Sequence, residues 1–245
     1  MIKKIWLNFQ LYLLFFLFTC VYTPLLAIIV IGARPFIGKR RMMKLFRFVI
    51  AFYGKIVIRV LPWPWVKVRF NDREPQLTPP YIVICNHRAA SDPFLMAVLK
   101  HETVQVVNKW PLRLPLLGLM GRLSGCLSVN EMPYADFNAK VKMLLEEGVC
   151  VAAFPEGTRS GSRQMGQFHG AMFRIAVEAG VPVVPMVITG NEDKPKKGTL
   201  WLEPGVICVE KLPALTAQDY HNKNAFCFKN QVRDIIASQI QKVER

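Results

Sequence analysis

Residues 5–33 contain no charged side chain, which is unusual for a segment of a soluble domain. Residues 11–31 would span about 30 Å as a helix at about 1.5 Å per residue, which matches the hydrocarbon core of a bilayer. A secretory signal peptide would be shorter and would end in a small-x-small cleavage site, which does not follow here. We therefore expect a retained membrane segment. Pro24 leaves two forms open, a helix that crosses the bilayer and a re-entrant or hairpin segment.

Basic residues dominate the rest of the chain, with 32 Lys and Arg against 17 Asp and Glu and a formal net charge of +15. Four of them follow the apolar segment: Arg34, Lys39, Arg40 and Arg41. They outnumber the two lysines before it, so the positive-inside tendency places the bulk of the chain on the cytoplasmic face of a bacterial-type inner membrane or its equivalent. Because no DNA- or RNA-binding motif is present, we expect this charge to attract anionic lipid headgroups or phosphate-bearing substrates and not nucleic acid.

The stretch of residues 39–65 mixes basic side chains at roughly helical spacing with Phe, Ile, Val and Leu. It ends in Trp63 and Trp65. This pattern predicts an amphipathic helix that lies in the membrane interface with an aromatic anchor. The same pattern fits an ordinary core helix with a solvated basic edge, and both interpretations stay open.

The six cysteines, at positions 20, 85, 126, 150, 208 and 227, form no C-x-x-C pair and no regular spacing. Three of them lie in apolar runs, as small core residues do. We expect a reduced, cytosolic setting with neither zinc nor disulfides.

From residue 66 onward, short apolar segments alternate with helical ones. Strands are predicted at residues 66–70, 81–85, 104–107, 126–129, 149–154 and 181–188, and helices at 93–99, 134–147, 173–180 and 225–241. The alternation predicts an α/β fold with a largely parallel central sheet flanked by helices. Residues 199–212 predict a hairpin, turned at Pro204 and Gly205, that supplies an antiparallel edge. We divide the chain into membrane-anchoring and interfacial helices at residues 1–65 and a catalytic domain at residues 66–245.

A polar segment, NHRAASD at residues 86–92, follows the predicted strand at 81–85. A histidine at a strand end titrates near neutral pH, so His87 would suit a general base, with Asp92 fixing its tautomer. The pair Asp92–Pro93 is equally typical of a helix start, and the spacing does not decide between the two. Ser91 lacks the G-x-S-x-G context of a nucleophile elbow.

A second polar segment, FPEGTRS at residues 154–160, follows another predicted strand. Gly157 permits a backbone geometry that a side chain would block, and Arg159 offers a bidentate fork for a phosphate. Glu156 would hold Arg159 or bind an acceptor hydroxyl, although a polar turn in which Glu156 and Arg159 neutralise each other is the simpler alternative. Because ligands gather beyond the carboxyl ends of strands in open α/β sheets, we expect both segments to face one cleft.

Taken together, the motifs resemble those of the glycerolipid acyltransferases of the 1-acylglycerol-3-phosphate acyltransferase family. The family's N-H-x-x-x-x-D stands at residues 86–92, its F-P-E-G-T-R-S at residues 154–160 and its V-P-V-x-P at residues 181–185. Their order and separations also agree, and the likeness covers roughly residues 66–212. The ordered set is a far more specific signal than any one motif.

The resemblance implies transfer of an acyl chain from acyl-CoA or acyl carrier protein to the free hydroxyl of a lysolipid, foremost 1-acylglycerol-3-phosphate, in phospholipid biosynthesis. His87 would deprotonate that hydroxyl while Asp92 orients the ring, a contribution typically worth ~10²–10⁴-fold. No acyl-enzyme, metal or cofactor beyond the thioester co-substrate is implied. The residues implied to bind substrate are Glu156, Gly157, Thr158 and Arg159 at the glycerol phosphate and Pro185 at the acyl pocket.

One position departs from the family pattern. Asn130 stands where the family's second motif has an arginine that binds phosphate, and an amide cannot supply a charge-assisted fork. Lys109 or Arg122 would have to compensate. The acceptor could therefore be a lysophospholipid with a larger headgroup or an aminolipid. Two further alternatives are a transacylase or lysophospholipase that needs no thioester and a non-catalytic protein that binds anionic membrane lipids.

Overall fold

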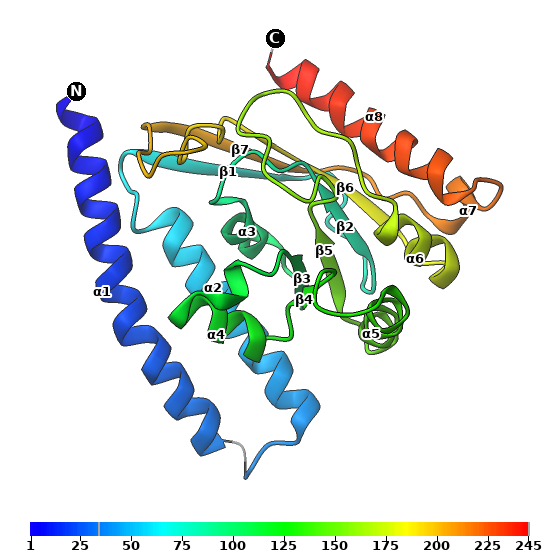
Figure 1. Cartoon of the computed structure of the whole chain (residues 1–245), viewed down its shortest axis with the longest axis horizontal. Coiled ribbons are helices and arrows are strands. Elements are labelled where there is room, and N and C mark those ends of the chain that lie inside the picture. The colour runs from blue at the N-terminus through cyan, green and yellow to red at the C-terminus, as the bar shows by residue number, and fades with distance from the viewer. Residues whose placement is uncertain (34, 245) are drawn as a thin grey trace.

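The computed structural model of the chain describes residues 1–33 and 35–244. Arg34, one of the four basic residues after the apolar segment, lies outside the described residues. Eight α-helices and two short 3-10 helices surround one sheet within this part of the chain (Figure 1). The helices are α1 Ile2–Ala33, α2 Lys39–Arg59, α3 Asp92–Leu95, η1 Met96–Val98, η2 Pro111–Arg113, α4 Pro115–Leu123, α5 Tyr134–Glu146, α6 Ala171–Ala179, α7 Ala217–Tyr220 and α8 Ala225–Val243.

The sheet has seven strands in the order β1-β7-β6-β2-β5-β3-β4. They are β1 Val66–Asp72, β2 Ile82–Cys85, β3 Thr103–Val107, β4 Leu127–Ser128, β5 Cys150–Ala153, β6 Val183–Thr189 and β7 Gly205–Lys211. From β6 to β4 all neighbours are parallel, whereas β7 pairs antiparallel with β6 and parallel with β1. The prediction of a largely parallel α/β sheet with an antiparallel edge is confirmed.

The predicted hairpin at residues 199–212 is wrong, because only its second half forms a strand, β7. The backbone that should have supplied the first half is bonded elsewhere. Leu202 donates its N–H to Asn8 Oδ1 at 2.8 Å, and its carbonyl accepts from Asn8 Nδ2 at 2.9 Å. A side chain of α1 therefore satisfies this backbone in place of a neighbouring strand.

Each central strand sends alternate side chains to two separate cores, because successive side chains of a strand point to opposite faces. Ile82 and Ile84 of β2 pack in a core with residues of α5, α6 and α8. Val83 and Cys85 pack in the other core, with residues of α3, η1 and the start of α1. Figure 1 shows α5, α6 and α8 on one side of the sheet and α1, α2 and α3 on the other.

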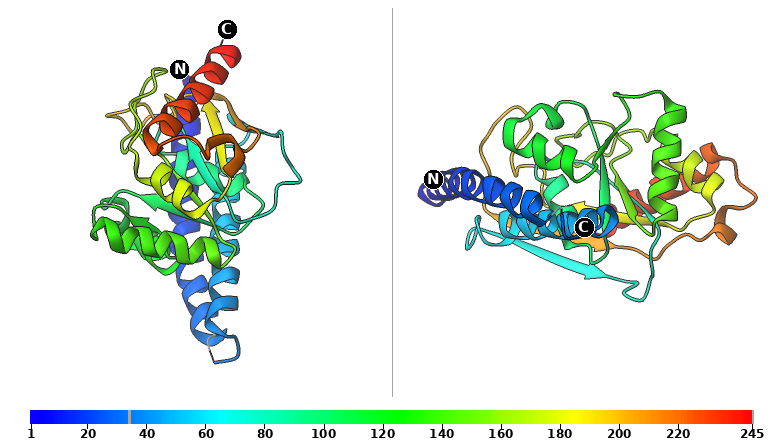
Figure 2. Two further views of the ribbon diagram at one scale, coloured as in Figure 1. Left: turned by 90° about the vertical axis from the view of Figure 1, so that its right-hand side faces the viewer. Right: turned by 90° about the horizontal axis from the view of Figure 1, so that it is seen from below.

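Helix α1 continues through Pro24, and it is the one described helix long and apolar enough to cross a membrane by length and composition. Helices α1 and α2 extend together beyond the sheet (Figure 2). They are joined by aromatic packing, with the rings of Phe18 and Tyr53 stacked at 5.2 Å. Many large apolar side chains of α1 stay exposed, among them Phe9, Phe16 and Ile28, so this face is compatible with membrane association.

Helix α2 fulfils the prediction of an amphipathic helix, but part of its basic face is turned inward. Arg40 forms a bidentate pair with Glu102, with N–O distances of 2.8 and 2.9 Å. Arg47 donates to the same carboxylate at 2.7 Å and to the carbonyl oxygen of Ser124 at 2.9 Å. These bonds hold α2 to the residue before β3 and to the end of α4.

Candidate active site

The carboxyl ends of β2, β5 and β6 lie side by side, because β2 pairs with both of the other strands in parallel. The two polar segments predicted from the sequence follow β2 and β5. Their backbones are bonded directly: Ser160 N–H donates to the carbonyl of His87 at 2.8 Å, and Gly161 N–H donates to that of Arg88 at 3.2 Å. The expectation that they share one cleft is confirmed.

His87 and Asp92 form the expected pair, with His87 Nδ1 at 2.8 Å from Asp92 Oδ2. With Nδ1 engaged in this way, Nε2 is the ring nitrogen left to accept a proton. The ring packs against Phe154 with the centroids 4.6 Å apart, and His87 lines a large cavity. The Ser91 hydroxyl also lies at this cavity, but it has no hydrogen-bond partner among the described residues.

The Asp92 carboxylate is completely buried and accepts from several donors. Besides the His87 ring, Oδ2 accepts the backbone N–H groups of Arg88 at 2.7 Å and Ala89 at 2.9 Å. Asp92 is also the first residue of α3, although Ser91 occupies the N-cap position. The alternative of a helix start is therefore correct for the backbone, while the side chain serves the histidine and its turn.

Two neighbours of the pair were not singled out from the sequence. Asn191, which follows β6, is fully buried and donates its Nδ2 to Asp92 Oδ1. The preceding Gly190 has a φ of 72°, and a Cβ there would lie 2.3 Å from the Val206 carbonyl oxygen. Only glycine fits this turn easily, and the turn brings Asn191 to Asp92. The available signal was a polar residue directly after a third parallel strand.

Asn86 and Arg88 anchor the same turn from either side of His87. The Asn86 side chain donates to the Ile188 carbonyl at 2.9 Å and accepts the Ile188 N–H at 2.8 Å, which extends the β2–β6 ladder by one step. The buried Arg88 guanidinium pairs with Glu244 at the end of α8 and donates to the Arg163 carbonyl at 2.9 Å. The base is therefore carried on a segment tied to three distant parts of the fold.

Both carboxylate oxygens of Glu156 accept backbone N–H groups. Oε1 accepts from His87 and Oε2 from Gly166, each at 2.7 Å. Burial raises the pKa of the Glu156 carboxyl above its ordinary value, while the two N–H donors act in the opposite direction. No ion pair joins Glu156 to Arg159 in the described part of the chain. This placement favours a positioning role over direct contact with an acceptor.

Gly157, Thr158 and Arg159 lie at the wall of the cavity and are partly or fully exposed. Gly157 has a φ of 71°, and a Cβ there would lie 3.1 Å from the His169 ring. The predicted need for glycine is thus met by the geometry. Among the described residues, no carboxylate pairs with the Arg159 guanidinium. The backbone carbonyl of Arg159 accepts from Lys197 Nζ at 3.0 Å.

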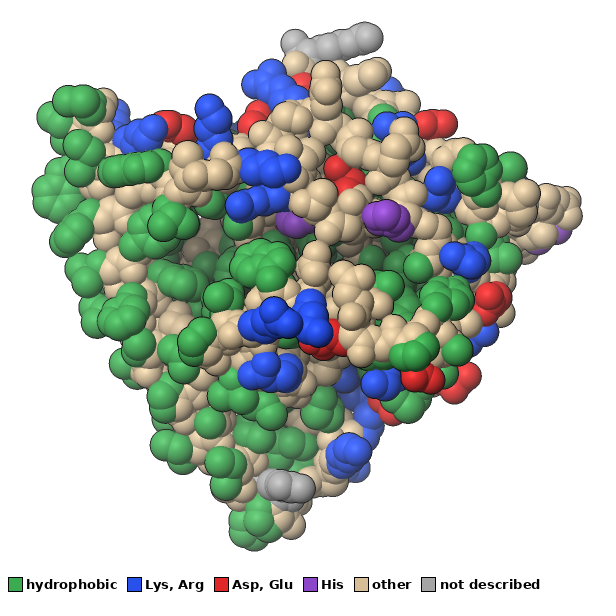
Figure 3. Space-filling model, viewed as in Figure 1, with side chains coloured by type: hydrophobic (Ala, Val, Ile, Leu, Met, Phe, Trp, Pro, Cys, Tyr) green, Lys and Arg blue, Asp and Glu red, His purple; other side chains and the backbone are tan. Residues whose placement is uncertain are grey.

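The cavity measures about 1390 Å³ and reaches from the His–Asp pair to the space between α1, α2 and α4. Apolar side chains line this far part, among them Phe15, Phe48, Leu117 and Met120. Figure 3 shows Lys, Arg and His side chains gathered over the middle of this face and hydrophobic ones over the side formed by α1. One end of the cavity is polar and basic, and the other suits a hydrocarbon chain.

Four other predicted site residues are not gathered around His87 to the same degree. Asn130 lines the cavity and donates weakly to Asn108 Oδ1 at 3.4 Å. Lys109 and Arg122 do not line it, and Arg122 donates to the carbonyl of Leu112. Pro185 is buried within β6, opposite Ile84 of β2, and is not among the cavity walls.

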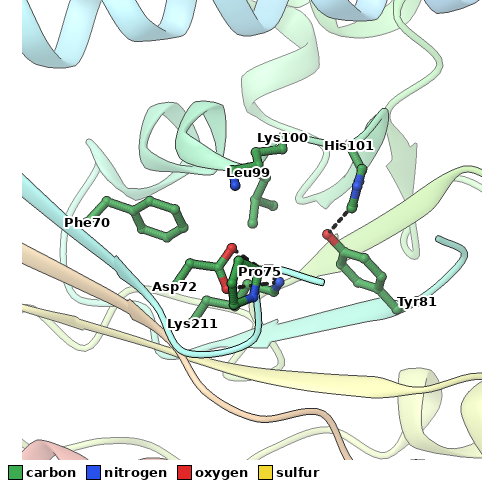
Figure 4. A pocket seen from close by; sticks show the side chains of 8 residues that line it. All are labelled: Phe70, Asp72, Pro75, Tyr81, Leu99, Lys100, His101 and Lys211. Atoms are coloured by element: carbon green, nitrogen blue, oxygen red, sulfur yellow. Dashed lines mark hydrogen bonds and ion pairs between the residues drawn. The ribbon is translucent and has the colours of Figure 1, made fainter. Parts of the chain in front are cut away.

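A second group of polar side chains lies at the other end of β2, around Tyr81, which directly precedes that strand (Figure 4). Tyr81 OH is 3.0 Å from His101 Nδ1, and Lys211 Nζ is 3.1 Å from Asp72 Oδ1. Burial lowers the pKa of His101, and the positive charge of Lys211 acts in the same direction. The space between these residues is only about 10 Å³, at the lower limit for one water molecule, so it is no substrate site. Across residues 1–33 and 35–244, no cluster of three or more His, Cys, Asp or Glu could hold a metal ion.

A His–Asp pair on the wall of a long apolar cavity, in an α/β fold, defines an enzyme that acts on a molecule with a hydrocarbon chain. The chain belongs to the acyltransferase family, which matches residues 66–189, just over half of its length. It is an O-acyltransferase of the 1-acylglycerol-3-phosphate acyltransferase type, as the motifs predicted.

Known proteins of this type cover most of the chain. The 1-acyl-sn-glycerol-3-phosphate acyltransferase of Limnanthes alba is 25% identical over 209 residues, which are 75% of this chain and 74% of the relative. The enzyme of that name from Salmonella typhimurium is 29% identical over 196 residues, 77% and 76% of the two chains. The crystal structure of the 1-acyl-sn-glycerophosphate (LPA) acyltransferase PlsC from Thermotoga maritima shares the fold, with a TM-score of 0.81 at 19% identity over 99% of this chain and 97% of that one.

Proposed function

We propose that the protein transfers a fatty acyl chain from acyl-CoA or acyl carrier protein to the free hydroxyl of 1-acylglycerol-3-phosphate. The relatives named above carry that acceptor in their names. The observation that carries the proposal is the position of His87 on the wall of a cavity whose far part is apolar and whose near part holds Arg159. A lysolipid phosphate has the same division, with a hydrocarbon chain at one end and a dianionic headgroup at the other.

In the proposed reaction His87 Nε2 accepts the proton of the acceptor hydroxyl, and the resulting alkoxide attacks the thioester carbonyl carbon. The tetrahedral intermediate collapses by breaking the carbon–sulfur bond, and the imidazolium returns its proton to the leaving thiolate. Asp92 holds Nδ1 at 2.8 Å and stabilises the positive charge that forms on the ring. Glu156 and Asn191 hold the base and its carboxylate in place.

The acceptor's phosphate would lie at Gly157, Thr158 and Arg159, where a guanidinium without a carboxylate partner in the described chain can form a fork with two phosphate oxygens. The acyl chain would enter the apolar part of the cavity between α1, α2 and α4. No metal or further cofactor is part of this proposal.

We infer that α1 holds the enzyme to one leaflet of the membrane, on the cytoplasmic face, without crossing the bilayer. The support is that the chain contacts the catalytic domain both near the start of α1 and shortly after its end. Lys4 pairs with Glu203 and Asn8 bonds Leu202 at one end, whereas Arg40, seven residues after α1, pairs with Glu102. A crossing helix would place these two ends on opposite sides of the bilayer.

The proposal is tested with purified protein in detergent, acyl-CoA and acyl carrier protein donors, and a panel of lysolipids. His87→Ala should reduce turnover by about 10²–10⁴-fold, whereas His221→Ala, at an exposed position remote from the cavity, should not. Undiminished turnover of His87→Ala would refute the mechanism. Product formed without any thioester would indicate a transacylase or lysophospholipase, and vesicle binding with no product from any donor would indicate a lipid-binding protein.

A further inference from the structure

Arg174, in the first turns of α6, lines the same cavity as Arg159 and Asn130. It is an exposed residue, so an ordinary solvated charge is the simplest account of it. Its position is nevertheless constrained, because the guanidinium carbon lies 4.9 Å from the centre of the Tyr134 ring. Such stacking fixes the plane of an arginine while its N–H groups stay available.

Within the described residues, no carboxylate forms an ion pair with Arg174. Glu178, one turn further along α6, is the nearest candidate in sequence. Its Oε2 instead accepts from Lys142 at 2.7 Å and from Asn138 at 3.0 Å. The pKa of the Glu178 carboxyl is lowered mainly by these two bonds, and the charge of Arg174 adds to the same effect. Within the described part of the chain, Arg174 and Arg159 thus both line the cavity without an ion-pair partner.

The two cations expected to compensate for Asn130 do not reach the cavity. Arg122 is bonded to the carbonyl of Leu112, and neither it nor Lys109 contributes to the cavity wall. A phosphate monoester carries a charge of about −1.5 to −2 near pH 7, more than one arginine balances. Arg47 and Lys194 also line the cavity, but they are paired with Glu102 and Asp193. Arg174, stacked on Tyr134, is the further cation of the cavity wall.

We propose that Arg174 is the second phosphate ligand of the acceptor, and that it makes the site selective for a lysolipid whose headgroup is a phosphate monoester. The inference rests on the proposed function, because it assigns a further contact to that same substrate. Tyr134 acts as a positioning residue that holds the guanidinium toward the cavity. The enzyme would then favour lysophosphatidate over lysophospholipids with a larger headgroup, despite the amide at Asn130.

The experiment compares wild type, Arg174→Gln, Arg174→Lys and the control Lys140→Gln, which removes an exposed positive charge on α5 away from the cavity wall. Two readouts are taken: the KM values for 1-acylglycerol-3-phosphate and for acyl-CoA, and the Kd of the 2-deoxy analogue, which cannot react. Arg174→Gln should raise the acceptor KM and the analogue Kd by about tenfold or more, with kcat and the acyl-CoA KM little changed. Arg174→Lys should recover part of the loss.

The stacking contact gives an independent check. Tyr134→Phe keeps the ring and should behave as wild type, whereas Tyr134→Leu should raise the acceptor KM severalfold. An unchanged acceptor KM and Kd in Arg174→Gln would overturn the inference while leaving the proposed function intact. A rise in the acyl-CoA KM instead would assign Arg174 to the phosphates of the donor and also overturn it. A wild type that acylates no lysolipid would remove both proposals.

Discussion

The carboxylate of Glu156 accepts the backbone N–H of His87 at 2.7 Å, so a residue of the FPEGTRS segment fixes the position of the base in the NHRAASD segment. Its other oxygen reaches the Gly166 N–H at the same distance. The two segments are thus joined by hydrogen bonds, and Glu156 can be essential to the site without touching the substrate. Kinetics can distinguish this positioning role from substrate binding.

Glu156→Gln should lower kcat about 10–100-fold with little change in the acceptor KM. The reason is that both carboxylate oxygens accept N–H groups, and a glutamine amide would turn its own NH₂ toward one of them. Steady-state kinetics on Glu156→Gln, Glu156→Ala and the exposed control Glu146→Gln provide the measurement. If KM rises more than kcat falls, Glu156 contacts the acceptor directly, as its motif implied.

Asn191→Ala should lower kcat by a similar factor, because Asp92 loses the amide that holds its Oδ1. Asn191→Asp should be at least as damaging, since it places a second negative charge against a buried carboxylate. A double-mutant cycle with Asp92→Ala tests the assignment: the effect of Asn191→Ala should largely vanish in that background. An equal loss in both backgrounds would mean that Asn191 acts independently of Asp92. Asn222→Ala, on the surface, is the control.

The sequence was most informative where a pattern is local. Periodicity and turn residues predicted the strands and helices to within a few positions, and strand ends predicted that His87 and Arg159 would share a cleft. Asn191 could not be assigned, because its partner Asp92 lies 99 residues away and their contact depends on β6 lying beside β2. The hairpin prediction failed for the same reason, since a local turn signal was overridden by a bond from α1.

The orientation of polar side chains was equally beyond the sequence. Arg88 occupies a variable position of its motif, yet it is almost fully buried and bonded to the end of α8. Glu156 and Arg159 are close enough in sequence to suggest an ion pair, yet Glu156 accepts two backbone N–H groups, and Arg159 has no ion-pair partner in the described chain. The apolar cavity forms only when α1, α2 and α4 pack together, so the pattern of a single segment could not predict it.

Glu102→Gln should lower the free energy of unfolding at pH 7 by about 3 kcal/mol, because it leaves the buried Arg47 without its counter-ion. Burial alone would raise the pKa of the Glu102 carboxyl, but Arg40 and Arg47 outweigh it and hold the pKa below the ordinary 4.5. The stabilisation is therefore present above pH 4.5 and is lost as the pH falls through the lower folded-state pKa.

The check is urea unfolding in detergent at pH 7 and near pH 3, with the exposed Glu131→Gln as control. The gap between wild type and Glu102→Gln should narrow at the lower pH, because a protonated glutamate and a glutamine are then nearly equivalent. A gap of the same size at both pH values would show that packing, and not charge, is the source of the loss.

Both ends of α1 should be accessible from the same side of the membrane. The catalytic domain contacts the chain before the apolar segment, through Lys4, within its first turn, through Asn8, and after it, through Arg40. Single cysteines at Ile2 and Gly38, placed in a chain from which the six native cysteines have been removed, allow a direct measurement with a membrane-impermeant thiol reagent. Both positions suit labelling, since Ile2 is exposed and a Cβ at Gly38 would meet no atom within 4 Å.

In vesicles of defined orientation, both cysteines should react only when the catalytic domain faces outward. Reaction of one cysteine in each orientation would establish that α1 crosses the bilayer, and the contacts at one of its ends would then have to break in the membrane-bound enzyme.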